Sequence, residues 1–339
     1  MVLGTAAGLI LLLCLTLALF GLPVVSSLQV MGQGAFGDKF GLSRTAVKMT
    51  PLLLAGLGMV VAWRAGMYNI GGEGQFLLGG LGGAAFAKLL MGAPGIPAPL
   101  QTCLILLGSL LGGAAWASLA AWLYVKRGVE VVISTILLNF VAVQFLGWAV
   151  EGPLQEPKGQ LPQTELLPDA VQLWRPDRQL DFHAGVIVAL LAAAAIYFVL
   201  FKTTFGFRLR LVGANARTAR ANRISVEGAQ FQALALSGAL CGLAGGVEFT
   251  GMAGQIGADF AQGWGFLAIP VALLGALHPA GTVFSALFFG AVFAGSEHLS
   301  RFTVSGATLL YVVQGAAVLA FIGVRAGLGR RANGVAPST

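Results

Sequence analysis

Long apolar runs recur along the whole chain, and they constrain its fold more than any other feature. A helix needs about 20 mostly apolar residues to span a bilayer. Charged residues make up only 10% of the sequence, whereas soluble domains contain about 25%. We therefore predict an all-α integral membrane protein of about ten transmembrane helices, at 3–25, 47–63, 70–91, 101–124, 130–150, 184–202, 229–249, 262–277, 280–297 and 303–322.

Glycine is abundant, with 49 residues. In water a glycine inside a helix is unfavourable, but between membrane helices it lets two backbones approach closely. The glycine content therefore predicts tightly packed transmembrane helices. The first segment has no positive flank and a long apolar stretch, so we expect a retained first helix rather than a signal peptide.

The distribution of Lys and Arg predicts the orientation. With the N-terminus inside, twelve of the 20 basic residues fall in cytoplasmic segments and eight fall outside. Positive residues concentrate in cytoplasmic loops, so both termini are expected to be cytoplasmic. The polytopic transmembrane domain then covers residues 1–322, and residues 323–339 form a cytoplasmic tail.

Two loops between the predicted spans are long. Residues 151–183 contain five prolines and charges of both signs, which is typical of a solvated extracytoplasmic loop. Residues 203–228 carry five arginines and a single acid, Glu227. Within this loop Asn215 to Asn222 favours a short amphipathic helix below the membrane, either as an anchor for anionic lipid or as a docking surface for a cytoplasmic partner.

The two halves of the chain resemble each other loosely. In each half an apolar helix leads into a glycine-rich stretch, Gly66–Gln75 in the first and Gly251–Phe260 in the second. Interrupted segments at corresponding positions of two halves indicate a transport path.

Polar residues inside the predicted spans give candidates for that path, because each is costly in lipid. An unwound start of the third segment would free backbone groups to bind a polar solute. Alternatively, Glu73 only caps its own helix. Thr135 and Asn139 are four residues apart and share a helix face, and Asn139 either lines the path or joins two helices. The candidate path residues are Asn69, Glu73, Gln75, Thr135 and Asn139.

Motifs of enzymes and cofactor sites are nearly absent. The sequence has no P-loop, HExxH or GxSxG pattern, and no spacing of Cys and His that favours a metal. We expect no cofactor, no metal and no nucleic-acid partner. The single GxGxxG at Gly32, Gly34 and Gly37 precedes no βαβ unit, so we interpret it as a flexible loop. Cys14, Cys103 and Cys241 are interpreted as small buried side chains in helices.

Several blocks of the sequence, in order, resemble one family. Met67–Phe76 (MYNIGGEGQF) resembles the FNIGAEGQ signature of ABC-transporter permeases for nucleosides and simple sugars, within the branched-chain amino acid and ribose permease superfamily. Glu130–Asn139 (EVVISTILLN) is similar to that family's EVISTIMLN segment. The blocks at Ser237–Gly246 and Ile269–Gly275 match later motifs. Gly72 and Pro270 stand where the family usually has Ala, and the proline could kink the eighth segment.

The resemblance implies a non-enzymatic membrane subunit of an ATP-driven importer in the bacterial inner membrane. It implies three protein partners: a cytoplasmic ABC ATPase, a second related permease and an extracytoplasmic solute-binding protein. Membrane lipid is a further expected partner, because the predicted spans lie in the bilayer. Gly206 to Ile224 resembles the loop on which the ATPase docks, which favours docking over a lipid anchor. The coupling candidates are Gly213, Asn215, Arg217, Ala219, Arg220 and Ile224.

Two other classes of protein are weighed against the importer. A secondary transporter working alone would normally show a carboxylate deep in a helix, whereas Glu73 lies near a helix end. A membrane-embedded enzyme would need a convergent catalytic cluster, which the sequence does not show.

Overall fold

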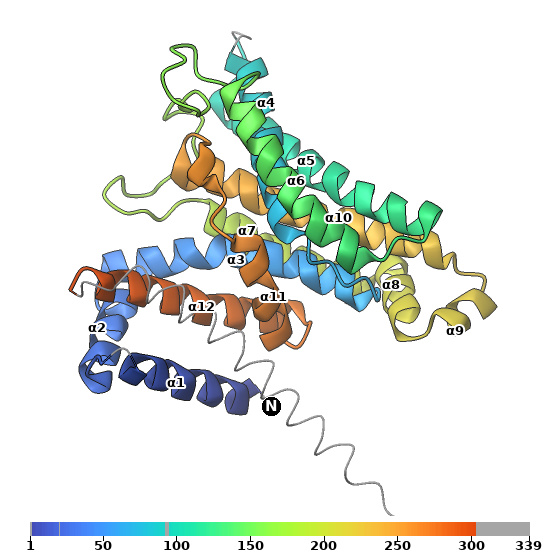
Figure 1. Ribbon diagram of the computed structural model, residues 1–339, viewed down its shortest axis with the longest axis horizontal. Helices are drawn as coiled ribbons and strands as arrows, with labels where there is room; N and C mark the ends of the chain where they lie inside the picture. The colour runs from blue at the N-terminus through green and yellow to red at the C-terminus, as the bar shows by residue number, and fades with distance from the viewer. Residues whose placement is uncertain (1, 20, 92–94, 303–339) are drawn as a thin grey trace, which may run out of the picture. The chain divides into compact units, whose positions relative to one another are not determined.

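The computed structural model describes residues 2–19, 21–91 and 95–302, and most of these residues are helical (Figure 1). Within this part of the chain the β structure is one isolated bridge between Gln163 and Gly257. The elements are α1 (Val2–Leu19), α2 (Val24–Phe36), α3 (Lys39–Arg64), α4 (Gly72–Met91), α5 (Ala98–Arg127), α6 (Val131–Glu151), α7 (Gly185–Lys202), α8 (Thr204–Ala214), α9 (Ala216–Ala221), α10 (Val226–Glu248), the π-helix η1 (Phe249–Ala253), the 3₁₀ helix η2 (Ala258–Phe260), α11 (Trp264–Leu274) and α12 (Pro279–Ser300).

The chain forms two compact units. One comprises the described residues of Met1–Lys48 and Leu287–Thr339, and the other comprises Met49–Ala286. In the first unit Leu17, Met31 and Leu299 form a buried apolar cluster.

The first unit corrects two sequence-based expectations. The predicted span at 3–25 ends at Leu19, and a second helix begins at Val24. The glycine pattern expected to be a flexible loop is mostly helical, because Gly32 and Gly34 lie in α2 and Gly37 caps its end. Gly34 has a structural reason to be glycine, since a Cβ there would overlap the side chain of His298.

Seven of the described helices are long and apolar enough to cross a membrane. Several match the predicted spans closely: 130–150 became Val131–Glu151, and 184–202 became Gly185–Lys202. Helix α3 begins at Lys39, eight positions before the predicted start at 47, so Lys39 and Arg44 lie on a helix rather than in a loop. The predicted eighth span is the shorter α11, which contains Pro270. The predicted span at 303–322 lies outside the described residues.

Helices α4, α5 and α10 pack side by side in the second unit (Figure 1). Their backbones meet where small residues face each other. A Cβ on Gly113 of α5 would lie only 2.6 Å from Cα of Gly242 on α10. This contact explains why glycine occupies both positions, and it agrees with the close packing expected from the glycine content.

All three cysteines lie in helices, but their burial differs. Cys241 is buried and Cys14 is partly buried, whereas Cys103 on α5 is exposed. The expectation of three buried cysteines was therefore wrong for Cys103.

Candidate functional site

Residues 65–71, between α3 and α4, form a non-helical connection that we call the break. Gly66 ends α3 in a left-handed conformation, with φ of 77°. The chain then turns back, so that the N–H of Met67 donates to the carbonyl of Ala62 at 2.9 Å. Glycine is the usual residue at such a helix end, because a side chain strains this conformation. The unwound start predicted for the third segment is thus present as this break.

Asn69 organises the interior of the break. Its Oδ1 accepts from the backbone N–H of Gly71 at 2.8 Å. Its Nδ2 donates to Gln75 Oε1 at 2.9 Å and to Ser237 Oγ on α10 at 2.9 Å. The amide of Gln75 returns a bond to Asn69 Oδ1 at 3.1 Å. These bonds use both polar atoms of the Asn69 side chain and link α4 to α10.

Two side chains of α6 satisfy the backbone of the break. Asn139 Oδ1 accepts from the N–H of Gly74 at 2.8 Å, and its Nδ2 donates to the carbonyl of Ile70 at 2.9 Å. Thr135 Oγ1 accepts from the N–H of Ile70 at 3.3 Å. The first N–H groups of a helix lack partners within it, and Asn139 supplies one for α4. Asn139 therefore joins α6 to the break, as one of the two interpretations from sequence proposed.

Glu73 connects the start of α4 to the start of α11. Its Oε1 accepts from the N–H of Gly263 at 2.9 Å, and its Oε2 accepts from the N–H of Gly265 at 2.8 Å. Acceptors at the N-terminus of a helix satisfy unpaired donors and interact favourably with the helix dipole. Glu73 thus caps α11, a helix from the other half of the chain.

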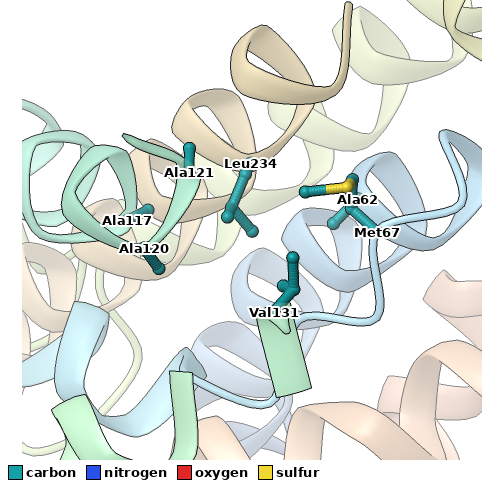
Figure 2. Close-up of a cluster of buried hydrophobic side chains, with 7 residues drawn as sticks. All are labelled: Ala62, Met67, Ala117, Ala120, Ala121, Val131 and Leu234. Carbon is teal, nitrogen blue, oxygen red and sulfur yellow. The ribbon is translucent and has the colours of Figure 1, made fainter. Parts of the chain in front are cut away.

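A compact apolar cluster borders the break (Figure 2). Met67, from the break itself, packs with Ala62 of α3, Val131 at the start of α6 and Leu234 of α10. Ala117, Ala120 and Ala121 of α5 complete the cluster. The small alanine side chains bring α5 close to α10, so the break is anchored by apolar packing as well as by hydrogen bonds.

The five candidate path residues converge on this one region and are all buried. The exposed fraction is 3% for Glu73 and Asn139, and lower for the other three, Asn69, Gln75 and Thr135. Since their polar groups bond to protein partners, they hold the break in shape. The exposed side chain of the break is Tyr68, with 56% of its surface accessible and its ring 5.3 Å from that of Trp63.

The partners of these residues were missed from sequence. Ser237, Gly263 and Gly265 lie far away in the chain, so no local pattern could connect them to Asn69 or Glu73. Tyr68 lies inside Met67–Phe76, the segment that resembles the family signature, and an aromatic residue directly before Asn69 was an available signal.

The arginine-rich loop at 203–228 contains two helices, α8 and α9, where one short helix was expected. Figure 1 shows α8 and α9 beside the start of α10. Asn215 separates the two helices and caps α9, because its Oδ1 accepts from the N–H groups of Arg217 at 3.0 Å and Thr218 at 3.1 Å. This geometry fixes where α9 begins.

We call α8, Asn215 and α9 together the α8–α9 hairpin. Five of the six coupling candidates lie on it, and Ile224 follows α9. Arg217 and Arg220 are exposed on α9, and Arg220 forms a salt bridge with Glu227 at 2.9 Å. Ala219 on the inner face of α9 is fully buried, and its carbonyl accepts from the N–H of Ile224 at 3.0 Å. The exposed face of α9 is therefore basic, and its opposite face is packed against the protein.

Gly213 places the end of α8 directly on the end of α3. A Cβ on Gly213 would overlap the carbonyl oxygen of Arg64 and lie 2.9 Å from the carbonyl carbon of Ala65. Gly66, the first turn of the break, faces Gly213 in return. The hairpin and the break are thus in backbone contact.

No group of three or more His, Cys, Asp or Glu side chains that could hold a metal ion occurs in the part of the chain that the structure describes. The polar side-chain atoms of the break bond to one another, to the backbone and to Ser237.

The fold therefore defines a class: a multi-pass helical membrane protein whose two glycine-broken segments meet in its interior. Residues 41–322 match the family described as the permease component of the branched-chain amino acid transport system. Because the match covers most of the chain, the protein belongs to this permease family.

Similar proteins from several organisms carry related descriptions. The chain is 35% identical over 309 residues to the glucose ABC transporter permease protein TsgB13 of Haloferax volcanii, with 88% of this chain and 80% of the relative covered. It is 32% identical over 304 residues to the guanosine ABC transporter permease protein NupP of Bacillus subtilis, covering 88% and 84%. A second guanosine permease protein of B. subtilis, NupQ, is 29% identical over 256 residues, covering 73% and 78%.

Proposed function

We propose that this chain is the membrane-spanning subunit of an ATP-driven ABC importer for a nucleoside or simple sugar. The family match over residues 41–322 carries this proposal. The named substrates of the relatives, glucose and guanosine, support a small polar solute with several hydroxyl groups.

The break is the proposed centre of the translocation path. Non-helical backbone at membrane depth is tolerated where it is buried in protein or lines a cavity. Asn69, Glu73, Gln75, Thr135 and Asn139 would shape this part of the path by holding the backbone in place. Tyr68 would offer an exposed aromatic face, on which a flat base or the apolar face of a sugar could stack.

Alternating access is the proposed mechanism. Closure of the ATPases on ATP would push the α8–α9 hairpin, and the membrane helices would rock between outward and inward states. The contact of Gly213 with Arg64 supports a mechanical link between hairpin and break. The chain itself would break no bond, and its partners would hydrolyse ATP.

Three protein partners follow from this proposal. The basic surface of α9 would receive a cytoplasmic ABC ATPase through Asn215, Arg217, Arg220 and their neighbours. The presence of two similar permeases in B. subtilis supports a second, related permease as partner. The 151–183 loop would face an extracytoplasmic solute-binding protein.

The proposed setting is a bacterial inner membrane with both termini in the cytoplasm and about ten spans within residues 1–322. The arginines of α8 and α9 support the orientation, since basic loops remain on the cytoplasmic side. The 203–228 segment would then be the coupling loop.

Purification from the native membrane tests the central proposal. The chain should copurify with a nucleotide-binding subunit, and the eluate should hydrolyse ATP. Arg217→Glu should abolish this association, because it reverses a charge on the exposed face of α9. Arg178→Glu is the matched control, since Arg178 is an exposed arginine of the 151–183 loop, and it should leave the association intact.

A secondary facilitator predicts the opposite result. The chain would then be recovered alone, and liposomes containing it would take up solute without ATP. Solute uptake without any ATPase would overturn the importer and support the facilitator. Competition among labelled guanosine, other nucleosides and glucose would then identify the substrate in either case.

A further inference from the structure

Arg64 at the end of α3 and Arg210 within α8 lie against the same aromatic ring. The guanidinium carbon of Arg64 lies 5.7 Å from the ring centroid of Phe201, and that of Arg210 lies 5.0 Å from the same centroid. Phe201 is at the end of α7. His278 packs against this ring as well, with centroids 5.1 Å apart. Helices α3, α7 and α8 therefore bring two positive charges to one place.

These charges have no acidic partner among the described residues. The Nε of Arg64 donates to the backbone carbonyl of Leu277 at 2.8 Å, which is an uncharged acceptor. The Nε of Arg210 is buried without a hydrogen-bond partner. The two guanidinium groups also repel each other. A buried donor without a partner is unfavourable, so an acceptor placed at the Arg210 Nε would stabilise this region.

The chemistry of the pair favours a phosphate group. Guanidinium groups form paired, charge-assisted hydrogen bonds with the oxygens of phosphate, and they lose little hydration when they do so. A phosphate between Arg64 and Arg210 would neutralise both charges and supply an acceptor for the Arg210 Nε.

The surroundings indicate a lipid rather than a free ion. Arg64 and Phe201 end apolar helices that are long enough to cross the membrane, so the pair lies at the level of the headgroups. Phe198 on α7 is 60% exposed and Phe207 on α8 is 55% exposed. Phe198 is three residues before Phe201 on α7, and Phe207 is three residues before Arg210 on α8, so each shares a helix face with a residue of this site. These exposed rings would provide a surface for acyl chains.

We propose that Arg64 and Arg210 form a binding site for the phosphate of an anionic phospholipid, seated at the junction of α3, α7 and α8. The site does not require transport activity, and only its assignment to the cytoplasmic leaflet rests on the proposed orientation. That leaflet is rich in anionic lipid. Because α8 also contacts the break through Gly213, the bound lipid would stabilise the hairpin in its packed position.

Lipid binding to the purified, delipidated chain tests this site. Native mass spectrometry would measure binding of phosphatidylglycerol and of phosphatidylcholine to the wild type, to Arg64→Gln and to Arg210→Gln. Each substitution should weaken phosphatidylglycerol binding about tenfold, which corresponds to about 1.4 kcal/mol. Arg208→Gln is the matched control, because Arg208 is exposed on the same helix. Its binding should equal that of the wild type.

Thermal unfolding in detergent separates binding from misfolding. Phosphatidylglycerol should raise the midpoint of the wild type and of Arg208→Gln, whereas it should not raise that of Arg210→Gln. The midpoints in phosphatidylcholine should be similar for all three, because bound ligand stabilises only proteins that bind it. Equal phosphatidylglycerol binding by wild type and Arg210→Gln would overturn the site.

Two further measurements would identify a different ligand at Arg64 and Arg210. If inorganic phosphate alone displaces phosphatidylglycerol and raises the midpoint equally, the site binds free phosphate and the lipid assignment is wrong. If Arg64→Gln binds lipid normally but no longer copurifies with the ATPase, the arginines serve a partner's carboxylate instead. Loss of lipid binding with normal ATPase association would support the lipid site, whatever the outcome for transport.

Discussion

Glu73 accepts a hydrogen bond from the backbone N–H of Gly265 at 2.8 Å, across 192 positions of sequence. Its other oxygen accepts from Gly263 at 2.9 Å. The helix that begins after the first broken segment therefore holds the start of the helix that follows the second. This cross-connection ties the two halves of the chain together at the point where each leaves regular helix.

Removal of the Glu73 carboxyl group should destabilise this junction. Glu73→Ala leaves two backbone donors without partners, and each unsatisfied buried donor is unfavourable by about 1–3 kcal/mol. The midpoint of thermal unfolding should fall, and uptake should be lost. Glu73→Gln keeps one acceptor of similar shape and should fall between wild type and Glu73→Ala. Equal midpoints for Glu73→Ala and wild type would show that the bonds contribute nothing.

Loss of the Asn139 amide should also destabilise the break. Asn139→Leu has a similar size but cannot bond to Gly74 N–H and Ile70 carbonyl, so it should lower the unfolding midpoint and uptake together. Gln144→Leu, at an exposed position of the same helix, should lower neither. A variant Asn139→Leu with normal uptake would exclude a role for this bond in holding the break.

His183 should make the fold sensitive to acid. Burial, and to a lesser degree the positive charge of Arg175, lower the pKa of His183 from 6.5 to about 4. Its Nδ1 accepts from the N–H of Gly185 at 3.1 Å, so the ring is held neutral. The folded state therefore favours neutral His183, and the contribution of His183 to the free energy of unfolding is fully present above pH 6.5. It should be lost progressively as the pH falls from 6.5 to about 4, by about 3 kcal/mol in total.

Unfolding midpoints between pH 7 and pH 5 measure this effect. His183→Asn keeps an acceptor near Gly185 but has no group that titrates in this range. Its midpoint should change less with pH than that of the wild type. Parallel pH profiles for the two proteins would contradict the assignment to His183.

Because α5 and α10 pack closely, the fold should not tolerate a larger side chain between them. A side chain at Gly242 would lie 2.8 Å from Cα of Gly113. Gly242→Val should therefore force the helices apart, and such overpacking is unfavourable by about 1–3 kcal/mol. The folded fraction that remains in detergent after mild heating would measure this destabilisation. Gly32→Ala, where a Cβ meets open space, should leave this fraction unchanged.

Local sequence pattern predicted some features of this fold well. Helix α7 was predicted within one residue at its start because its run of apolar residues is bounded by polar loops. Helix α3 was predicted eight residues too short, because Lys39, Arg44 and Lys48 lower its hydropathy at that end. Backbone hydrogen bonds do not depend on hydropathy, so the helix continues through these residues. Helix α8 was missed for the same reason, since its arginines resemble a loop.

In the candidate site, residues close together in the sequence were predicted, whereas their partners from distant parts of the chain were not. Asn69 and Gln75 are six residues apart, and sequence placed both at the start of the same segment. Their third partner, Ser237, is 168 residues from Asn69. Only the packing of α10 against α4 brings it into reach, and a single sequence does not encode that contact in any local pattern. The same holds for Glu73 and Gly265.

The contact between Gly213 and Arg64 leads to the most direct test of coupling. A Cβ at position 213 would overlap the Arg64 carbonyl, so Gly213→Ala should push α8 away from the start of the break. Alanine favours a helix over glycine by about 1 kcal/mol, so a loss of function could not arise from a weaker α8. We expect ATPase association to persist while solute uptake per ATP hydrolysed falls severalfold. Gly147→Ala on α6, where the added Cβ meets open space, should leave uptake and ATP hydrolysis at wild-type values. Normal uptake by Gly213→Ala would show that motion reaches the break by another route.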